Sequence, residues 1–207
     1  MLCFLLLSLA ASNPGPTRST TLTCDVRKAP YNAVGDNTTD ETAILQRAIE
    51  ECDTVLLSGP ATYLVTESLM LTSNLTVRLD ANTTIHSRQP LCDPHGTTPD
   101  PATGKVYPRC KQTPGCPTLY WSTGPTAILC GTNLTNVALI GADPDTSIID
   151  GGGWPWYTAG VQNKSMQGQG PRAYELAWSK NITLQRVGFH NSPSWTVRVN
   201  PHSGPPA

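Results

Sequence analysis

The sequence predicts an all-β fold in which short strands stack as the coils of a parallel β-helix. Residues 180–200 hold three short runs of alternating apolar and polar residues. The apolar members of these runs are Ile182 and Leu184, Val187 and Phe189, and Trp195, Val197 and Val199. No Asn-Gly or Asp-Gly pair joins the runs, so we do not expect hairpins. Strands separated by sharp bends fit a solenoid, in which each strand pairs with its equivalent one coil away.

The phrase that opens this stretch occurs twice upstream. An asparagine precedes an apolar alternation at Asn74, at Asn136 and at Asn181. Loosely spaced copies are typical of a parallel β-helix, because each coil contributes equivalent strands while the loops between them vary in length. The repeat therefore supports the same fold class.

The composition indicates a turn-rich β protein. The 207 residues carry a formal net charge of −1, 14 % of them are charged, and Gly (17) and Pro (19) are frequent. A nucleic-acid partner is not expected, because proteins of that class normally present a basic face. The length allows one elongated domain or two small ones.

Residues 1–11 form an apolar run that ends in small residues. The run is too short to span a bilayer, which takes about 20 residues. We interpret it as a secretory signal peptide cleaved between Ala10 and Ser12, although a buried first strand would look similar and the usual basic start is missing. The mature protein is then expected outside the cell, with no membrane partner.

One amphipathic helix is predicted between Val34 and Cys52. Thr38 and Glu41 have the spacing of a capping box, and Asp40 and Glu41 would lie where the helix dipole favours acids. The apolar stripe at helical spacing consists of Ile44, Leu45, Ala48, Ile49 and Cys52. A solenoid needs a cover over the open strand edges of its first coil, and this helix immediately precedes the first strands.

Cysteines and glycosylation triplets support the extracellular interpretation. Without Cys3, an even set suited to disulfides remains: Cys24, Cys52, Cys92, Cys110, Cys116 and Cys130. Cys24 and Cys52 flank the predicted helix, so we expect these two to pair. Acceptor triplets of the Asn-x-Ser/Thr kind begin at Asn37, Asn74, Asn82, Asn133, Asn163 and Asn181.

The remaining strands are short and separated by turns. They are predicted at residues 54–57, 62–65, 68–71, 75–79, 83–85, 127–130, 137–140 and 147–149. Residues 87–126 lack periodicity and contain three cysteines, which indicates a long loop held by disulfides. Residues 151–170 are predicted to be a second irregular segment.

With these elements in order, the sequence resembles the polygalacturonases, the family-28 glycoside hydrolases. The similar segments are the helix at 35–49, the Ala-Thr-Tyr-Leu step at 61–64, the Ile-Asp-Gly phrase at 149–156 and the Asn-Ser-Pro-x-Trp-Thr phrase at 191–196. The resemblance covers roughly residues 34–200. It implies a right-handed, single-stranded parallel β-helix domain at 20–207, incomplete at its C-terminal end.

The resemblance also implies hydrolysis of α-1,4-linked galacturonan in pectin with inversion. One carboxylic acid protonates the leaving oxygen, and carboxylates on the opposite face activate a water. The family carries these acids in Asn-Thr-Asp and Asp-Asp motifs, followed by Gly-His-Gly and a sugar-binding Arg-x-Lys. Asn-Thr-Asp, Asp-Asp and Gly-His-Gly do not occur in this sequence. We therefore assign no catalytic residue in this chain, and we expect residues 12–207 to release no sugar.

Three residues near the C-terminus are candidates for substrate binding. Arg198 alternates away from its apolar neighbours, so it should point out of the core, where a guanidinium could bind a galacturonate carboxylate; a solvated surface arginine is equally compatible. His190 and Asn191 sit at a strand end and could line the cleft, although a turn role explains them as well. Trp195 could stack on a sugar ring, but its parity with Val197 favours packing in the core.

Other motifs are weaker. Cys92, His95, Cys110 and Cys116 could be read as zinc ligands, but disulfides are favoured in a secreted chain. The glycines at 151–153 lack the Gly-Lys-Ser/Thr of a phosphate loop, and His86 and His202 show no ligand spacing. We expect no cofactor and no metal.

The leading hypothesis is a secreted, monomeric pectin-degrading glycoside hydrolase, with an acidic polysaccharide as its partner. A non-catalytic β-helix module that binds plant-wall polysaccharide is the alternative. A lyase-type enzyme on the same scaffold is a third, but it would need a cation-binding acidic cluster, which the sequence does not show.

Overall fold

The computed structural model describes residues 21–117, 126–163, 166 and 169–200. The predicted signal peptide at 1–11 lies outside the described residues. None of the helices in the described part is long and apolar enough to cross a membrane.

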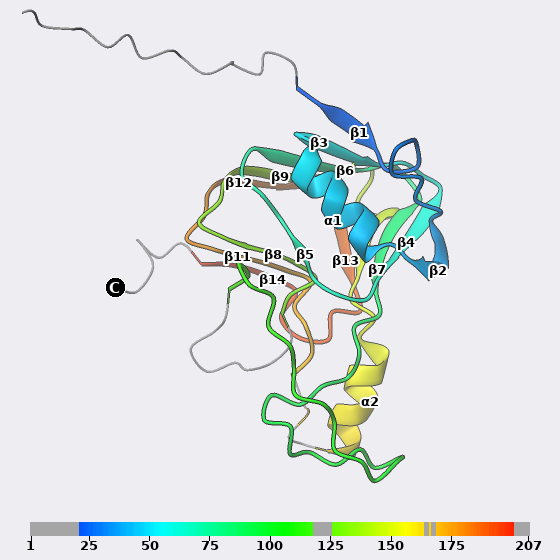
Figure 1. Cartoon of the computed structure of the whole chain (residues 1–207), viewed down its shortest axis with the longest axis vertical. Coiled ribbons are helices and arrows are strands. Elements are labelled where there is room, and N and C mark those ends of the chain that lie inside the picture. The colour runs from blue at the N-terminus through cyan, green and yellow to red at the C-terminus, as the bar shows by residue number, and fades with distance from the viewer. Residues whose placement is uncertain (1–20, 118–125, 164–165, 167–168, 201–207) are drawn as a thin grey trace, which may run out of the picture.

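Three parallel sheets form the wall of the coil (Figure 1). Sheet A contains β1 (Thr23–Asp25), β3 (Thr54–Leu57), β6 (Leu75–Leu79), β9 (Thr135–Gly141) and β12 (Lys180–Gln185). Sheet B contains β2 (Asp36–Asp40), β4 (Ala61–Val65), β7 (Thr83–Ser87), β10 (Ser147–Asp150) and β13 (Gly188–His190). Sheet C contains β5 (Leu69–Met70), β8 (Leu129–Thr132), β11 (Tyr174–Ala177) and β14 (Val197–Asn200).

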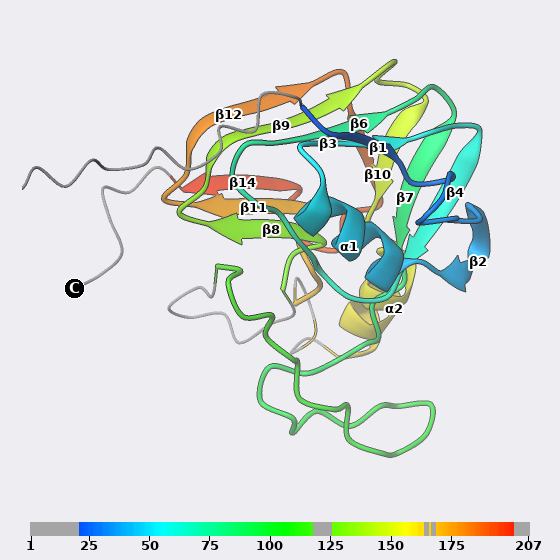
Figure 2. The same cartoon turned by 45° about the horizontal axis from the view of Figure 1, so that its top comes forward.

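From β3 onward the chain visits the three sheets in rotation, and every ladder of the sheets is parallel. For example, β6 pairs with β3 on one side and β9 on the other, both in parallel. Figure 2 shows the three sheets enclosing one interior. The predicted all-β parallel β-helix is therefore confirmed.

Identical positions of successive coils stack into apolar columns inside the wall. In sheet A, Val77 is in register with Leu139. In sheet B, Tyr63, Ile85 and Ile149 occupy equivalent positions. All five side chains are buried. Because each column runs along the coil, it joins strands that are far apart in the sequence into one hydrophobic core.

Helix α1 (Thr42–Glu51) covers the first coil, as predicted, but it begins after the predicted capping box. Thr38 lies in β2, and the capping position is Glu41, which makes no side-chain cap hydrogen bond. The Glu41 carboxylate instead turns inward and accepts hydrogen bonds from the backbone N–H of Val34 and of Gly35. The prediction of a capping box is wrong because residues 36–40 pair with β4 as a strand and are not available to the helix.

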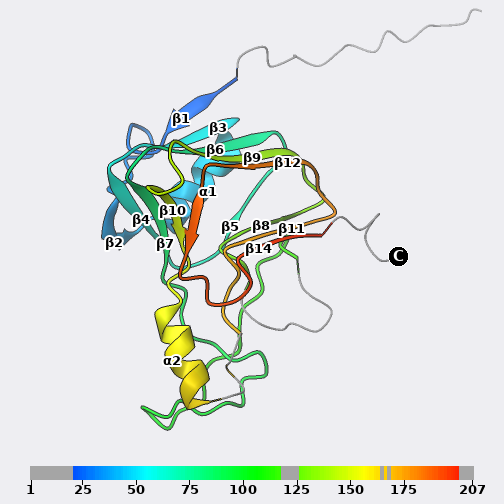
Figure 3. The ribbon, with the colours of Figure 1, turned by 180° about the vertical axis from the view of Figure 1, so that it is seen from behind.

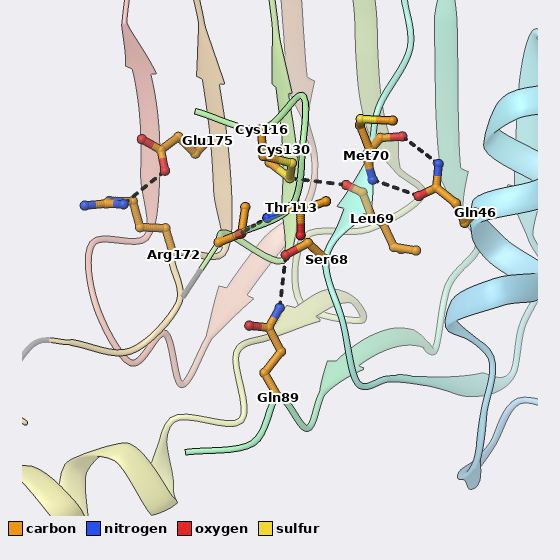
Figure 4. Close-up of a disulfide and its surroundings, with 11 residues drawn as sticks. Gln46, Ser68, Leu69, Met70, Gln89, Thr113, Cys116, Cys130, Arg172 and Glu175 are labelled. Carbon is orange, nitrogen blue, oxygen red and sulfur yellow. Dashed lines mark hydrogen bonds and ion pairs between the residues drawn. A yellow bond between two sulfur atoms is a disulfide. The ribbon is translucent and has the colours of Figure 1, made fainter. Parts of the chain in front are cut away.

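One side chain of α1 substitutes for a missing strand beside β5. The Gln46 amide accepts from Met70 N at 2.8 Å and donates to Met70 O at 3.1 Å (Figure 4). A free sheet edge would leave these backbone groups without partners in the fold. The helix therefore closes sheet C by hydrogen bonding as well as by burial of Leu45, Ala48 and Ile49.

The three asparagines of the sequence repeat form a ladder on the outside of sheet A. The Asn136 side-chain amide donates to Asn74 Oδ1 at 2.8 Å, and that of Asn181 donates to Asn136 Oδ1 at 2.7 Å. All three residues have positive φ, between 54° and 61°. Asparagine tolerates this left-handed conformation better than most residues, which explains its place at the bend before each strand.

A second helix, α2 (Trp154–Gln162), corrects the prediction that residues 151–170 are irregular. It packs Trp156 and Ala159 against Tyr107 and the disulfide between Cys92 and Cys110, in a small hydrophobic cluster of its own. Figure 3 shows α2 and the loop after β7 projecting together from one side of the coil. Sequence periodicity missed α2 because its apolar residues surround the helix instead of forming one stripe.

The six cysteines that remain without Cys3 form three disulfides: Cys24–Cys52, Cys92–Cys110 and Cys116–Cys130. The first is the pairing expected from the position of the helix. The other two occupy the cysteines that could have been read as zinc ligands. Together they fasten the long loop between β7 and β8, as the sequence indicated.

Candidate functional site

The outward face of sheet C carries the candidate site. Met70, Cys130, Glu175 and Arg198 occupy equivalent positions on successive strands. Figure 4 shows the Cys116–Cys130 disulfide between Met70 on one side and Glu175 on the other. The loop that carries Cys116 covers the first part of this row, and the charged residues follow on β11 and β14. We call Arg172, Glu175, Trp195 and Arg198 the arginine cluster.

Glu175 is the centre of the arginine cluster. Its carboxylate accepts hydrogen bonds from Arg172 Nη1 at 3.0 Å and from Arg198 Nη1 at 3.4 Å. The Glu175 side chain is only 3 % exposed. Each oxygen therefore faces a different guanidinium, which fixes both arginines. Burial lowers the pKa of Arg198 and the Arg172 charge adds to this, while the Glu175 charge opposes it. Arginine remains protonated in any case, so the cluster has a net charge of +1.

The prediction that Trp195 packs in the core is wrong, because its side chain is 64 % exposed. The strand β14 begins at Val197, so the alternation that placed Trp195 inside does not extend back to it. Its ring lies 5.5 Å from the Arg172 guanidinium carbon and 5.9 Å from that of Arg198. These distances are within the range of cation–π attraction. The ring and the two cations thus form one surface.

His190 and Asn191 lie elsewhere, at the end of β13 in sheet B. Asn191 donates to both carboxylate oxygens of Asp150, at 3.2 and 3.1 Å, and Gly151 N donates to His190 O at 2.8 Å. These contacts hold the turn that leads into α2. Of the three candidates, only Arg198 contacts Glu175. Asn191 instead contacts Asp150 in the turn before α2, and the binding role of His190 and Asn191 stays a prediction.

Arg172 and Glu175 were missed from the sequence. Both belong to the segment around β11, which was not predicted as a strand. The signal was short, because Tyr174 and Leu176 are the only two apolar residues that alternate with Glu175 there. The pairing with Arg198 spans 23 residues along the chain, and only the register of β11 with β14 brings the two together.

The sequence contains one spacing of the Arg-x-Lys kind, which in the family binds the sugar. It consists of Arg109 and Lys111, on either side of Cys110. It lies in the disulfide-held loop before β8, well upstream of the place where the resemblance puts such a pair. Position alone therefore separates it from the family's motif.

These observations define the class as a parallel β-helix protein with an exposed tryptophan and two arginines on one sheet face. No family model matches the chain. A probable polygalacturonase from Vitis vinifera is 28 % identical over 181 residues, a match that covers 81 % of this chain and 32 % of that protein. The resemblance to polygalacturonases predicted from the sequence is thus confirmed, and the chain spans about a third of the length of this relative.

One solved structure supports the fold. The crystal structure of a "putative glycosyl hydrolase" from Parabacteroides merdae superposes with a TM-score of 0.50 at 15 % identity, covering 86 % of this chain and 79 % of that one. At this identity the likeness concerns the fold. The surface adhesin PfbA of Streptococcus pneumoniae gives a TM-score of 0.40 at 18 % identity, over 82 % of this chain and 38 % of that one.

Proposed function

We propose that this chain belongs to a protein that hydrolyses α-1,4-galacturonan in pectin, and that the arginine cluster binds the acidic sugar. The single observation that carries the proposal is the pair of guanidinium groups held beside an exposed Trp195 by a buried Glu175. The similarity to a probable polygalacturonase supports the choice of polymer.

The chemistry of the arginine cluster suits a uronic acid. A guanidinium donates two parallel hydrogen bonds to a carboxylate, and an aromatic ring packs against the C–H face of a sugar. Both arginines already share Glu175, so a substrate carboxylate would use the donors that Glu175 leaves free. Glu175 is therefore a positioning residue, and Arg198 is the group that we expect to touch substrate.

The hydrolytic step needs acids that this chain's sequence does not show. Inversion requires one carboxylic acid at the leaving oxygen and carboxylates across the bond that activate a water. Glu175 suits neither role, because it is buried and ion-paired to two arginines. We accordingly expect the described surface to bind galacturonan and to leave hydrolysis to residues outside it.

A wall-binding module without catalysis is the second candidate, and the same observation favours it. The arginine cluster can bind a polyanion without a catalytic acid beside it. Release of reducing sugar from polygalacturonate separates the two candidates. We expect none from the 207-residue chain by itself, and measurable release would contradict our assignment of the acids to other residues.

Secretion is part of the proposal. The three disulfides are typical of proteins that fold in an oxidising compartment. Cleavage of residues 1–11, glycosylation at the Asn-x-Ser/Thr triplets and a monomeric state remain predictions of the same kind.

The test of sugar binding is calorimetric titration with trigalacturonate. We expect the Arg198→Gln variant to bind about 10- to 100-fold more weakly, because hydrogen bonds to charged groups contribute about 1.5–3 kcal/mol. Arg78→Gln is the matched control, since Arg78 is an exposed arginine on β6 in sheet A. Equal affinity of the Arg198→Gln variant and the unmodified chain would refute the binding role of the cluster.

A further inference from the structure

A cavity of about 380 Å³ lies between residues 66–68, which precede β5, and the long loop between β7 and β8. Its wall is formed by residues 66–68, 89–90, 92, 108–109, 111–114 and 126. A volume of this size falls within the range of small-molecule binding sites. The cavity includes no member of the arginine cluster, so the proposed function does not account for it.

The walls of the cavity are held in place by the fold. The Cys92–Cys110 disulfide joins two of the wall segments, and Cys110 N donates to Asp93 O at 3.1 Å. Elsewhere in the wall, Thr113 N donates to the Thr126 hydroxyl at 2.9 Å (Figure 4). A site built in this way is largely formed before a ligand arrives, which lowers the entropy lost on binding.

The charges around the cavity favour an anion. Arg109 and Lys111 are two residues apart in an extended segment, and both are exposed. Within the part of the chain that the structure describes, neither side chain forms an ion pair. Glu67 is the remaining charged residue of the wall, so the cavity has a net charge of +1. Two unpaired cations at one opening attract an acidic ligand.

The uncharged part of the wall suits a sugar. Ser68, Gln89 and Thr113 supply hydroxyl and amide groups, and Gln89 already donates to the Ser68 hydroxyl at 3.4 Å. Three prolines, Pro90, Pro108 and Pro114, supply flat apolar surface. A ligand that carries one carboxylate, several hydroxyl groups and an apolar C–H face would use all three kinds of group.

We infer that this cavity is a second binding site, for the carboxylate-bearing ring of a sugar acid, with Arg109 and Lys111 as the carboxylate-binding pair. The inference rests on the cavity and its charges, and it holds whether or not the arginine cluster binds galacturonan.

The test is titration of the ¹⁵N-labelled 207-residue chain with D-galacturonate, followed by the amide signals of Ser68, Gln89 and Thr113. We expect saturable shifts at these three positions with galacturonate and none with neutral D-galactose. In the double variant Arg109→Gln, Lys111→Gln, the dissociation constant should rise by at least about tenfold. The matched control is Lys105→Gln, because Lys105 is an exposed cation of the same disulfide-closed loop and does not line the cavity.

Several results would overturn the inference. They are the absence of saturable shifts, equal shifts with galactose, equal shifts with inorganic phosphate, and a double variant that binds as well as the control. The signals of β6 report on folding, since both substituted side chains are exposed and far from that strand in the sequence. Arg198→Gln should leave the cavity shifts unchanged, so failure at one site is distinguishable from failure at the other.

Discussion

The β-helix coil and the flank differ in what holds them together; by the flank we mean residues 88–117 with α2. In each sheet of the coil, buried side chains of successive strands stack in columns, so a side chain in the middle of a sheet is packed against equivalents in the coils on both sides. The flank has a separate small cluster around the Cys92–Cys110 disulfide and α2. The comparison teaches that the coil is stabilised by repetition, whereas the flank depends on a few specific contacts.

The largest effect is expected from the coil. Leu139 is buried in the middle of sheet A, and Leu139→Ala should lower the free energy of unfolding by about 2–5 kcal/mol, because it leaves a cavity inside the column. Urea denaturation measures this. Arg78→Ala, an exposed change on the neighbouring strand, should cost less than about 0.5 kcal/mol. Similar losses of unfolding free energy in the two variants would contradict the view that the buried columns stabilise the coil.

A smaller effect is expected at the asparagine ladder. Asn136→Ala loses two side-chain hydrogen bonds. It also places alanine, which tolerates the left-handed conformation less well than asparagine, at a φ of 59°. We expect a loss of about 2 kcal/mol, of which about half is conformational. Asn136→Gly accommodates the conformation and should lose about 1 kcal/mol. If the two variants are equally stable, the left-handed backbone contributes nothing.

Glu41 should make the capped end of the coil sensitive to pH. Burial raises its pKa, although the hydrogen bonds from Gly35 and Val34 oppose this. The folded state then holds the proton more tightly than the unfolded chain. This contribution to stability is present below the unfolded-state pKa and is lost as the pH rises through the folded-state value. Unfolding of Glu41→Gln, measured from pH 4 to pH 7, should lack this loss; an unchanged pH profile would contradict the role of burial.

The smallest effect on the coil is expected from the flank. Replacing Cys92 and Cys110 by serine should leave the urea midpoint of the coil nearly unchanged, since the columns contain neither residue. The loop between them should become more accessible, because the disulfide closes it. Limited proteolysis should then cut between residues 93 and 109 faster in the variant. A large shift of the midpoint would show that flank and coil unfold as one unit.

The same contrast explains what could be predicted. The strands β3 and β6 have the predicted bounds, because β6 alternates polar and apolar residues over its whole length and the apolar run of β3 ends at the Ser-Gly-Pro turn of residues 58–60. Within β11, only Tyr174 and Leu176 alternate with Glu175, so the sequence signal was too short to predict a strand. The helix α2 depends on partners in the loop, and no local pattern reports them.

The candidate site was predicted in part for a related reason. The outward direction of Arg198 follows from parity within β14. The burial of Glu175 and the exposure of Trp195 follow from the register between strands and from where β14 begins, which a single stretch of sequence does not contain. Non-local pairing, and not local propensity, therefore decides which groups meet on sheet C.

The ladder of amides on sheet A also limits where oligosaccharides can be attached. Asn74 and Asn181 begin acceptor triplets, whereas Asn136 is followed by Val and Ala and cannot be an acceptor. Asn136 is also the member whose oxygen and nitrogen are both engaged by neighbours. A glycan on the Asn181 nitrogen would still leave it one hydrogen for its bond to Asn136. Sugar chains can thus stand at both ends of the row without interrupting it.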